Sequence, residues 1–264
     1  MNLFEAIIVA IVEGLSEFLP ISSTAHMVIT SSLMHLEKDP FTKYFEICIQ
    51  FGAILSVLVL YFKKFINFKS YQFYLKLLIA VIPSLVFGFF LNDFIDAKLE
   101  SPLFIAIIMI LGGILLLYVD KWFKTPIINR EEDIDNKLAV KIGFFQCLSI
   151  IFPGLSRSAA TIIGGMSQKI SKDVAAEFSF FLAVPTMAAA TGYKTLSYIK
   201  KEGLFTSDQL TTLFIGNAVA FVVALLAIKF FIGFVKERGF KIFGIYRIIL
   251  GCVVLLLIYL NVIG

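Results

Sequence analysis

Cysteine, histidine and charged residues are scarce in this chain of 264 residues. It has three cysteines and two histidines, and only 16% of its residues are charged. Cys48, Cys147 and Cys252 all lie in apolar segments, and an odd number without metal-ligand spacing indicates neither a disulfide framework nor a zinc site. Because an ordinary soluble domain carries about 25% charged residues, the low charge excludes a water-soluble fold of this size.

Long apolar runs take up most of the sequence instead. Hydrophobic residues make up 59% of it, and the stretches 103–119, 211–228 and 248–263 contain no charge. Each is close to the roughly 20 residues that a helix needs to cross about 30 Å of hydrocarbon. We therefore predict an all-α polytopic membrane protein, a single membrane domain over 1–264. Its six transmembrane helices are expected at 43–63, 71–92, 102–120, 174–200, 210–235 and 241–262.

Two further apolar regions are interrupted by proline. The runs 3–19 and 21–36 flank Pro20, and the runs 139–152 and 155–168 flank Pro153 and Gly154. A helix of 14 residues, the length of each run in the second pair, is only about 21 Å long. We predict two re-entrant helical hairpins, each entering and leaving on one side, because broken backbone is tolerated in a membrane only where helices or a water-filled cavity surround it.

The two halves of the chain, about 1–125 and 138–264, resemble each other. A shift of 133 places Pro20 on Pro153 and Ser23 on Ser156. Each half then contains one hairpin and three spans, and three is odd, so the second half must run inverted relative to the first. Such inverted-topology repeats place the functional site near the midplane, where the repeats meet.

Lysine and arginine are distributed unevenly between the predicted loops. Fifteen lie on the side opposite the first hairpin, and six lie on its own side. Those six are Lys38, Lys43, Lys98, Lys194, Lys200 and Lys201. The positive-inside rule then places both termini and the first hairpin outside and the second hairpin on the cytoplasmic side. The segment 129–137, rich in both signs, is predicted to be a solvated cytoplasmic loop.

Two glutamates precede the first proline. Glu13 and Glu17 are four residues apart and therefore share a helix face. Two carboxylates in a low-dielectric site either bind a cation or hold one proton between them. The alternative is that both are solvated near the membrane surface.

Hydroxyl residues and a histidine follow the same proline. Ser22, Ser23 and Thr24 open the next helix, and His26 lies on the same side of it as Ser23. The hydroxyls could be N-caps and nothing more, but a buried helix N-terminus is also a ready phosphate site. His26 could take a proton from Ser23 or give one to a leaving oxygen. The alternative is a packed, hydrogen-bonded histidine.

The second hairpin supplies the opposite charge. Arg157 is the only charged residue between Lys141 and Lys169. A guanidinium forms bidentate contacts with phosphate, and the hydroxyls beside it would complete an anion cradle. Those hydroxyls belong to Ser156, Ser158 and Thr161. The alternative is an Arg–Glu pair that holds the hairpins together, and both can be true if phosphate replaces the carboxylate on binding.

Four more polar residues lie within the predicted spans. Glu46 and Glu177 occupy matching places in the two halves, Gln50 follows Glu46 by one turn, and Arg247 lies in the last span. These residues could line the cavity or cap the broken hairpin backbone, and the two glutamates could form ion pairs with Arg247. We favour a supporting role for Glu177 and Arg247 and leave that of Glu46 open.

The polar residues described above belong to two stretches, EGLSEFLPISSTAH at 13–26 and PGLSRSAAT at 153–161. These stretches closely resemble the signature motifs of the undecaprenyl-diphosphate phosphatases of the bacitracin-resistance type, and the likeness continues at 45–50, 177–185 and Tyr246-Arg247. The resemblance implies a multi-pass hydrolase of the bacterial plasma (inner) membrane that removes the terminal phosphate of undecaprenyl diphosphate. That reaction regenerates the carrier lipid for peptidoglycan and other wall polymers, and abundant enzyme confers bacitracin resistance. The resemblance also implies an activity that depends on, or is stimulated by, Mg²⁺ or Ca²⁺.

Our hypothesis from the sequence gives each of these residues a role. Arg157 and the hydroxyls of Ser22, Thr24, Ser156, Ser158 and Thr161 bind phosphate, Glu13 and Glu17 hold the cation, and Ser23 attacks phosphorus with help from His26 or Glu17. His26 itself or water could be the nucleophile instead. The partner is a polyprenyl diphosphate lipid rather than nucleic acid, reached from the outer face, and a homodimer is allowed. A transporter or flippase of undecaprenyl phosphate is the competing class, because inverted repeats with broken helices also describe carriers.

Overall fold

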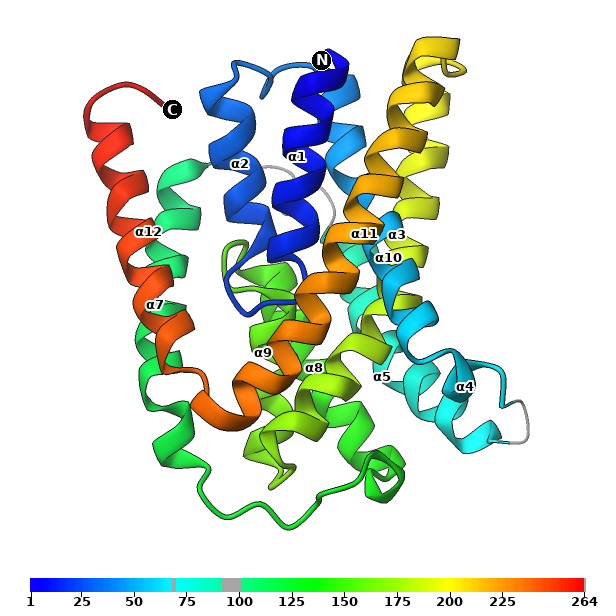
Figure 1. Cartoon of the computed structure of the whole chain (residues 1–264), viewed down its shortest axis with the longest axis vertical. Coiled ribbons are helices and arrows are strands. Elements are labelled where there is room, and N and C mark those ends of the chain that lie inside the picture. Colours follow the sequence, from blue (N-terminus) through cyan, green and yellow to red (C-terminus); the bar gives the residue numbers. More distant parts are fainter. Residues whose placement is uncertain (68–69, 92–100, 264) are drawn as a thin grey trace.

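The chain is a bundle of helices in the computed structural model, which describes residues 1–67, 70–91 and 101–263 (Figure 1). The first half contributes α1 (Leu3–Ser16), α2 (Ser23–Leu33), α3 (Pro40–Leu60), α4 (Phe62–Phe65), α5 (Tyr71–Phe90) and α7 (Pro102–Trp122). The second half contributes the short η1 (Glu131–Asp133), α8 (Asn136–Ile151), α9 (Arg157–Ser167), α10 (Lys172–Glu202), α11 (Ser207–Arg238) and α12 (Lys241–Tyr259). The described residues form no strand beyond an isolated bridge between Ile128 and Ile170.

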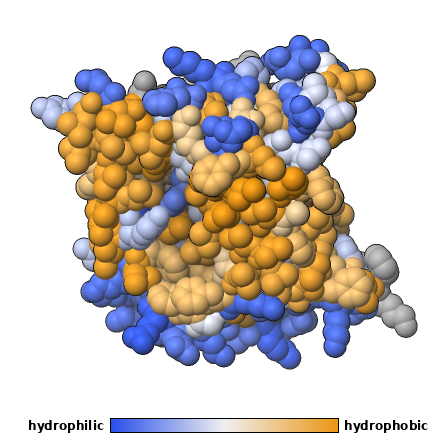
Figure 2. Space-filling view, turned by 45° about the horizontal axis from the view of Figure 1, so that its top comes forward, coloured by the Kyte–Doolittle hydropathy of each residue, from blue (hydrophilic) through white to orange (hydrophobic). Residues whose placement is uncertain are grey.

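Six of the described helices are long and apolar enough to cross a membrane: α3, α5, α7, α10, α11 and α12. They are the six predicted spans, with ends that move by three residues or fewer, so the all-α polytopic fold is confirmed. Residue 92 of the second span and Lys98 lie outside the described residues. Figure 2 shows the corresponding surface, an apolar belt between two hydrophilic ends. The start of α3 illustrates the local signals, because Pro40 is its first residue and Asp39 caps the free N–H groups of Phe41 and Thr42.

The two proline-broken regions form helix pairs at opposite ends of the bundle. In Figure 1, α1 and α2 lie in the upper half, α8 and α9 lie in the lower half, and both termini are at the upper end. Helices α1 and α8 have 14 and 16 residues, or about 21 and 24 Å, which is less than a membrane requires. This arrangement is compatible with the re-entrant hairpins and the inverted repeat, which stay predictions.

The loops at the two hairpin tips have the same strained cap. Ser22 and Ser156 have φ values of 72° and 75°, uncommon for non-glycine residues, and each side chain accepts from a backbone N–H three residues on. Ser22 is therefore the counterpart of Ser156, a shift of 134 (156 minus 22). The predicted pairing of Ser23 with Ser156 is wrong by one residue, because the second loop has an extra residue after its proline. That loop contains Gly154, with φ of 97°, where a Cβ would lie 2.7 Å from the Ile105 carbonyl oxygen.

Arg247 on α12 ties the two hairpin tips together. Its side chain is fully buried. Nη1 donates to the carbonyls of Pro20 (3.1 Å) and Leu155 (2.7 Å), and Nη2 donates to that of Gly154 (2.8 Å). Of the roles considered for Arg247, this is the capping of broken hairpin backbone.

Replacing Arg247 with methionine is expected to destabilise the fold. The carbonyls of Pro20, Gly154 and Leu155 would lose their donor, and a buried unpaired group costs about 1–3 kcal/mol. The midpoint of thermal unfolding in detergent should fall by about 5–10 °C. Arg238→Met, at the exposed end of α11, is the matched control. An unchanged midpoint for Arg247→Met would show that the tips do not depend on this arginine.

The segment 129–137 is not the freely solvated loop that its composition predicts. Glu131 is only 4% exposed, and Lys64 contacts its Oε2 at 2.6 Å. Lys76, buried on α5, donates to the carbonyls of Glu131 (3.3 Å) and Glu132 (3.0 Å). The salt bridge from Lys64 and the hydrogen bonds from Lys76, which span 55 or more residues of sequence, therefore dock this loop onto α4 and α5.

Candidate functional site

The candidate site lies where the tips of the two hairpins meet. Glu17, which caps the end of α1, and Arg157, the first residue of α9, form an ion pair of 3.0 Å between Oε1 and Nη2. Their side chains are only 5% and 13% exposed. Ser158 on α9 also donates to the carbonyl of Leu19 in the first tip, at 2.9 Å. The structure thus brings the predicted acidic and basic residues together and shows the Arg–Glu pair considered from the sequence.

Glu17 also holds the hydroxyl of Ser23. Ser23 Oγ donates to Oε2 of Glu17 at 2.5 Å. One carboxylate therefore accepts from a serine of the first hairpin and from an arginine of the second. Because Ser23 is the first residue of α2 and Arg157 the first of α9, the N-termini of both helices lie beside this pair. Such N-termini favour negative charge.

Arg157 is held from two further sides. Its Nη1 donates to the carbonyl of Ser179 on α10 at 2.8 Å, and its guanidinium lies 5.9 Å from the ring centroid of Phe18. Thr161 donates to the carbonyl of Arg157 at 2.9 Å and meets the hydroxyl of Ser179 at 2.6 Å. The guanidinium is therefore oriented before any ligand binds. Sequence reasoning missed Ser179, which lies two residues after Glu177 in a stretch noted only for its resemblance.

His26 has partners other than Ser23. Its Nδ1 lies 2.7 Å from the carbonyl oxygen of Ser22, and its Nε2 lies 2.7 Å from the hydroxyl of Tyr246 on α12. Of the two bases proposed for Ser23, Glu17 is therefore the one in contact with it. Tyr246 was also missed, and the only signal for it was its place beside Arg247 in a matching motif.

Glu13 is the most isolated polar group of the site. It is 0% exposed, and among the described residues neither of its oxygens has a hydrogen-bond donor. Its charged neighbours are Glu17, Glu46 and Arg157, and Oε1 of Glu46, half-buried on α3, is also without a partner in the described structure. Gln50, one turn further along α3, is half-buried as well.

These carboxylates fit a divalent cation only if the ligand completes its coordination. No group of three or more His, Cys, Asp or Glu in the described residues could hold a metal ion. However, Mg²⁺ is commonly bound by one or two carboxylates together with substrate phosphates. The unpartnered oxygens of Glu13 are suited to that arrangement.

The remaining hydroxyls predicted for phosphate binding divide into two groups. Ser158 and Thr161 are buried and their hydroxyls are engaged within the protein. Ser22 and Ser156 are the helix caps described above, and Ser156 also contacts Ser158 at 3.0 Å. Thr24 is half-buried in the first turn of α2, and no contact within the described part of the chain defines its role.

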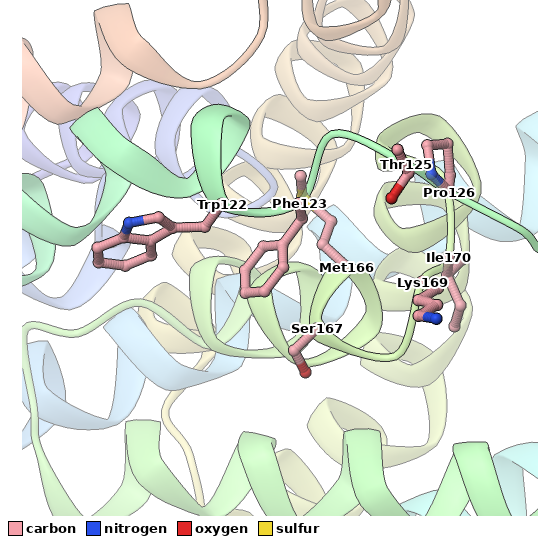
Figure 3. Close-up of a pocket in the computed structure, with 8 residues that line it drawn as sticks. All are labelled: Trp122, Phe123, Thr125, Pro126, Met166, Ser167, Lys169 and Ile170. Carbon is pink, nitrogen blue, oxygen red and sulfur yellow. The ribbon is translucent and has the colours of Figure 1, made fainter.

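Glu177 lies away from the hairpin tips. Tyr61 donates to its Oε1 at 3.3 Å, and its charged neighbours are Lys64, Asp173 and Glu131. It therefore belongs with the docked loop rather than with the site. A separate cavity of about 140 Å³ lies near the ends of α7 and α9 (Figure 3). Its lining includes Trp122, Met166 and Lys169 but none of the predicted site residues.

The fold and the site define an integral membrane protein with a buried acid–serine–arginine centre between two broken helix pairs. The chain belongs to the family described as bacitracin resistance protein BacA, whose model matches residues 6–253. It is 54% identical to the undecaprenyl-diphosphatase of Flavobacterium johnsoniae and 55% identical to that of Flavobacterium psychrophilum, each alignment covering 97% of this chain and 96% of the relative. It is also 51% identical to the undecaprenyl-diphosphatase of Bdellovibrio bacteriovorus, over 98% of this chain and 97% of the relative.

Proposed function

We propose that this protein is an undecaprenyl-diphosphatase, which hydrolyses undecaprenyl diphosphate to undecaprenyl phosphate and inorganic phosphate. The observation that carries the proposal is Glu17, whose carboxylate holds Ser23 on one oxygen and Arg157 on the other. A nucleophile, a base and an anion-binding group are thus in contact before substrate arrives. The full-length relatives with this name support the same activity.

Arg157 and the two helix N-termini bind the diphosphate. The incoming phosphate oxygens replace the carboxylate of Glu17 on the guanidinium, which can make paired contacts with them. The first N–H groups of α2 and α9 add further donors. Stabilisation of the phosphoryl oxygens in this way is where most catalysis of phosphoryl transfer arises.

Ser23 then attacks the terminal phosphorus. Its proton passes to Glu17, the bond from phosphorus to the bridging oxygen breaks, and undecaprenyl phosphate leaves with that oxygen. Glu17 passes the proton on to the departing lipid phosphate, and its carboxylate then activates a water molecule that hydrolyses the phosphoserine, which releases inorganic phosphate and returns a proton to Ser23. Direct attack by water on the diphosphate, or attack by His26, are the alternatives.

The family resemblance implies a divalent cation, and the carboxylates of the site could bind one. Glu13, with Glu17, would hold Mg²⁺ or Ca²⁺, which when bound would neutralise part of the diphosphate charge. Glu46 is a charged neighbour of Glu13 and would add negative charge around the same cation. Ser22 and Ser156 cap their helices beside the phosphate, and Ser158 and Thr161 hold the hairpin and Arg157 in place. Thr24, in the first turn of α2, would add a hydroxyl donor to the phosphate.

We place the protein in the bacterial plasma membrane, with the site open to the outer face. The lysine and arginine distribution supports this orientation. Hydrolysis there would return the carrier lipid to peptidoglycan and wall-polymer synthesis and would oppose bacitracin.

A lipid transporter is the second class of protein that the architecture allows, but transport does not require a serine hydroxyl fixed on a carboxylate beside an arginine. A homodimer stays a prediction.

Purified protein in detergent micelles should release phosphate from undecaprenyl diphosphate in the presence of Mg²⁺. A brief reaction quenched in acid and analysed by mass spectrometry should place a phosphoryl group on Ser23. Phosphate on His26 would reassign the nucleophile, and phosphate on neither residue would leave direct attack by water. Folded protein that releases no phosphate from this lipid would contradict the proposed function.

A further inference from the structure

Tyr246 makes a directed contact with the imidazole of His26. Its hydroxyl lies 2.7 Å from Nε2, and the two rings stack nearly parallel, with centroids 5.6 Å apart and an interplanar angle of 3°. The two residues are 220 positions apart in the sequence. The contact joins α12, the last helix, to the second helix of the first hairpin.

The other ring nitrogen settles the direction of this hydrogen bond. Nδ1 of His26 lies 2.7 Å from the carbonyl oxygen of Ser22, which can only accept, so Nδ1 carries a proton. In the neutral ring Nε2 is then an acceptor, and the Tyr246 hydroxyl donates to it. The Ser22 carbonyl therefore sets the tautomer of the imidazole, and the Tyr246 hydroxyl fixes the direction of Nε2.

The second hairpin supplies an internal comparison. Its cap, Ser156, has nearly the same φ as Ser22, but Ala160 stands where the first hairpin has His26 (156 plus 4, against 22 plus 4). The strained cap therefore forms without a histidine four residues on. The bonds of His26 are not needed for the turn, and their effect is on the imidazole itself.

Arg247, the next residue on α12, sets the position of Tyr246. Its hydrogen bonds to both hairpin tips fix the height and rotation of α12. Tyr246 is 42% exposed, and no other polar partner of its hydroxyl is present in the described structure. Consecutive residues of one helix therefore hold the hairpin backbone and the histidine.

We propose that Tyr246 is a positioning residue for His26, because its hydroxyl donates to the unprotonated Nε2 and so holds this acceptor nitrogen in one orientation in the site. This inference rests on the proposed phosphatase function. Loss of the hydroxyl should therefore act on the reaction only through His26.

The test compares Tyr246→Phe with Tyr118→Phe, a control at 45% exposure on α7. Tyr246→Phe keeps the stacked ring and should lower kcat about fivefold to tenfold, the loss expected for one hydrogen bond, with KM little changed. Tyr118→Phe should retain wild-type kinetics. In a His26→Gln background, Tyr246→Phe should have no further effect, because its target is gone.

Nitrogen-15 NMR supplies a readout that a structural role would not move. The chain has only two histidines, so a His35→Gln background leaves a single labelled imidazole. The wild-type and Tyr246→Phe proteins should both give the Nδ1–H tautomer, because the Ser22 carbonyl is unchanged, but the Nε2 resonance of Tyr246→Phe should move to higher chemical shift as its hydrogen bond is lost. An unchanged Nε2 chemical shift, or equal losses from Tyr246→Phe with and without His26, would overturn the proposal. Phosphate release by the wild-type protein in the same assay separates that outcome from failure of the proposed function.

Discussion

Replacing Arg157 with alanine is expected to lower kcat/KM for undecaprenyl diphosphate by about 10³-fold or more. Removing a single donor to a developing oxyanion costs about 10²–10³-fold, and an arginine at a phosphoryl group can be worth about 10³–10⁵-fold. The guanidinium is the only cationic group in contact with Glu17 in the described structure. No second arginine can take its place, because Arg247 is committed to the hairpin carbonyls. The measurement is phosphate release at varied lipid concentration in detergent micelles.

The control for this experiment is Arg238→Ala, which removes an exposed arginine at the end of α11. It should leave kcat/KM unchanged. Arg157→Ala also leaves the buried carboxylate of Glu17 without its cationic partner, so the folding of this variant should be checked by thermal unfolding. If the variant unfolds, Arg157→Lys keeps the charge but loses the paired donors, and should still lose activity. Activity retained by folded Arg157→Ala and Arg157→Lys would mean that the hairpin tips are not the phosphate site.

The features that the sequence predicts well are those with local causes. The six spans follow from apolar length, and the common face of Glu13 and Glu17 follows from a separation of four residues. The breaks at Pro20 and Pro153 follow because proline lacks a backbone N–H and clashes with the preceding turn, although α5 and α10 each continue through a proline, Pro83 and Pro185. Each depends on residues that are near one another in the chain.

The features that the sequence does not predict depend on distant contacts. Glu17 meets Arg157 across 140 residues, and His26 meets Tyr246 across 220. Chemical type alone cannot decide whether Ser23 lies against His26 or against Glu17, because all three are close in sequence and the tip loop sets the direction. The one-residue error in the repeat has a similar cause, since the extra residue of the second loop is visible only when both caps are compared. The sequence does not predict that Glu131 docks onto Lys64 and Lys76, because a segment rich in both charges ordinarily indicates a solvated loop.

Replacing Glu17 with glutamine should separate its role as a base from any role in binding. Glutamine keeps the shape and can still accept from Ser23, but it is a far weaker proton acceptor. General base catalysis contributes about 10²–10⁴-fold, so kcat should fall by about that factor. Because the neutral amide competes less with phosphate for Arg157, KM should fall or stay constant rather than rise.

The opposite kinetic pattern would identify a different role for Glu17. If Glu17 acts only by holding a cation or the substrate, Glu17→Gln should raise KM and leave kcat nearly unchanged. Glu202→Gln, at the exposed end of α10, is the matched control and should alter neither constant.

The variant Glu13→Gln tests whether Glu13 binds the divalent cation. If Glu13 is the cation ligand, this variant should need more Mg²⁺ for half-maximal activity and should bind Mn²⁺ more weakly, as measured by electron paramagnetic resonance. Glu17→Gln with the same Mg²⁺ requirement as wild type would then assign the base to Glu17 and the cation to Glu13.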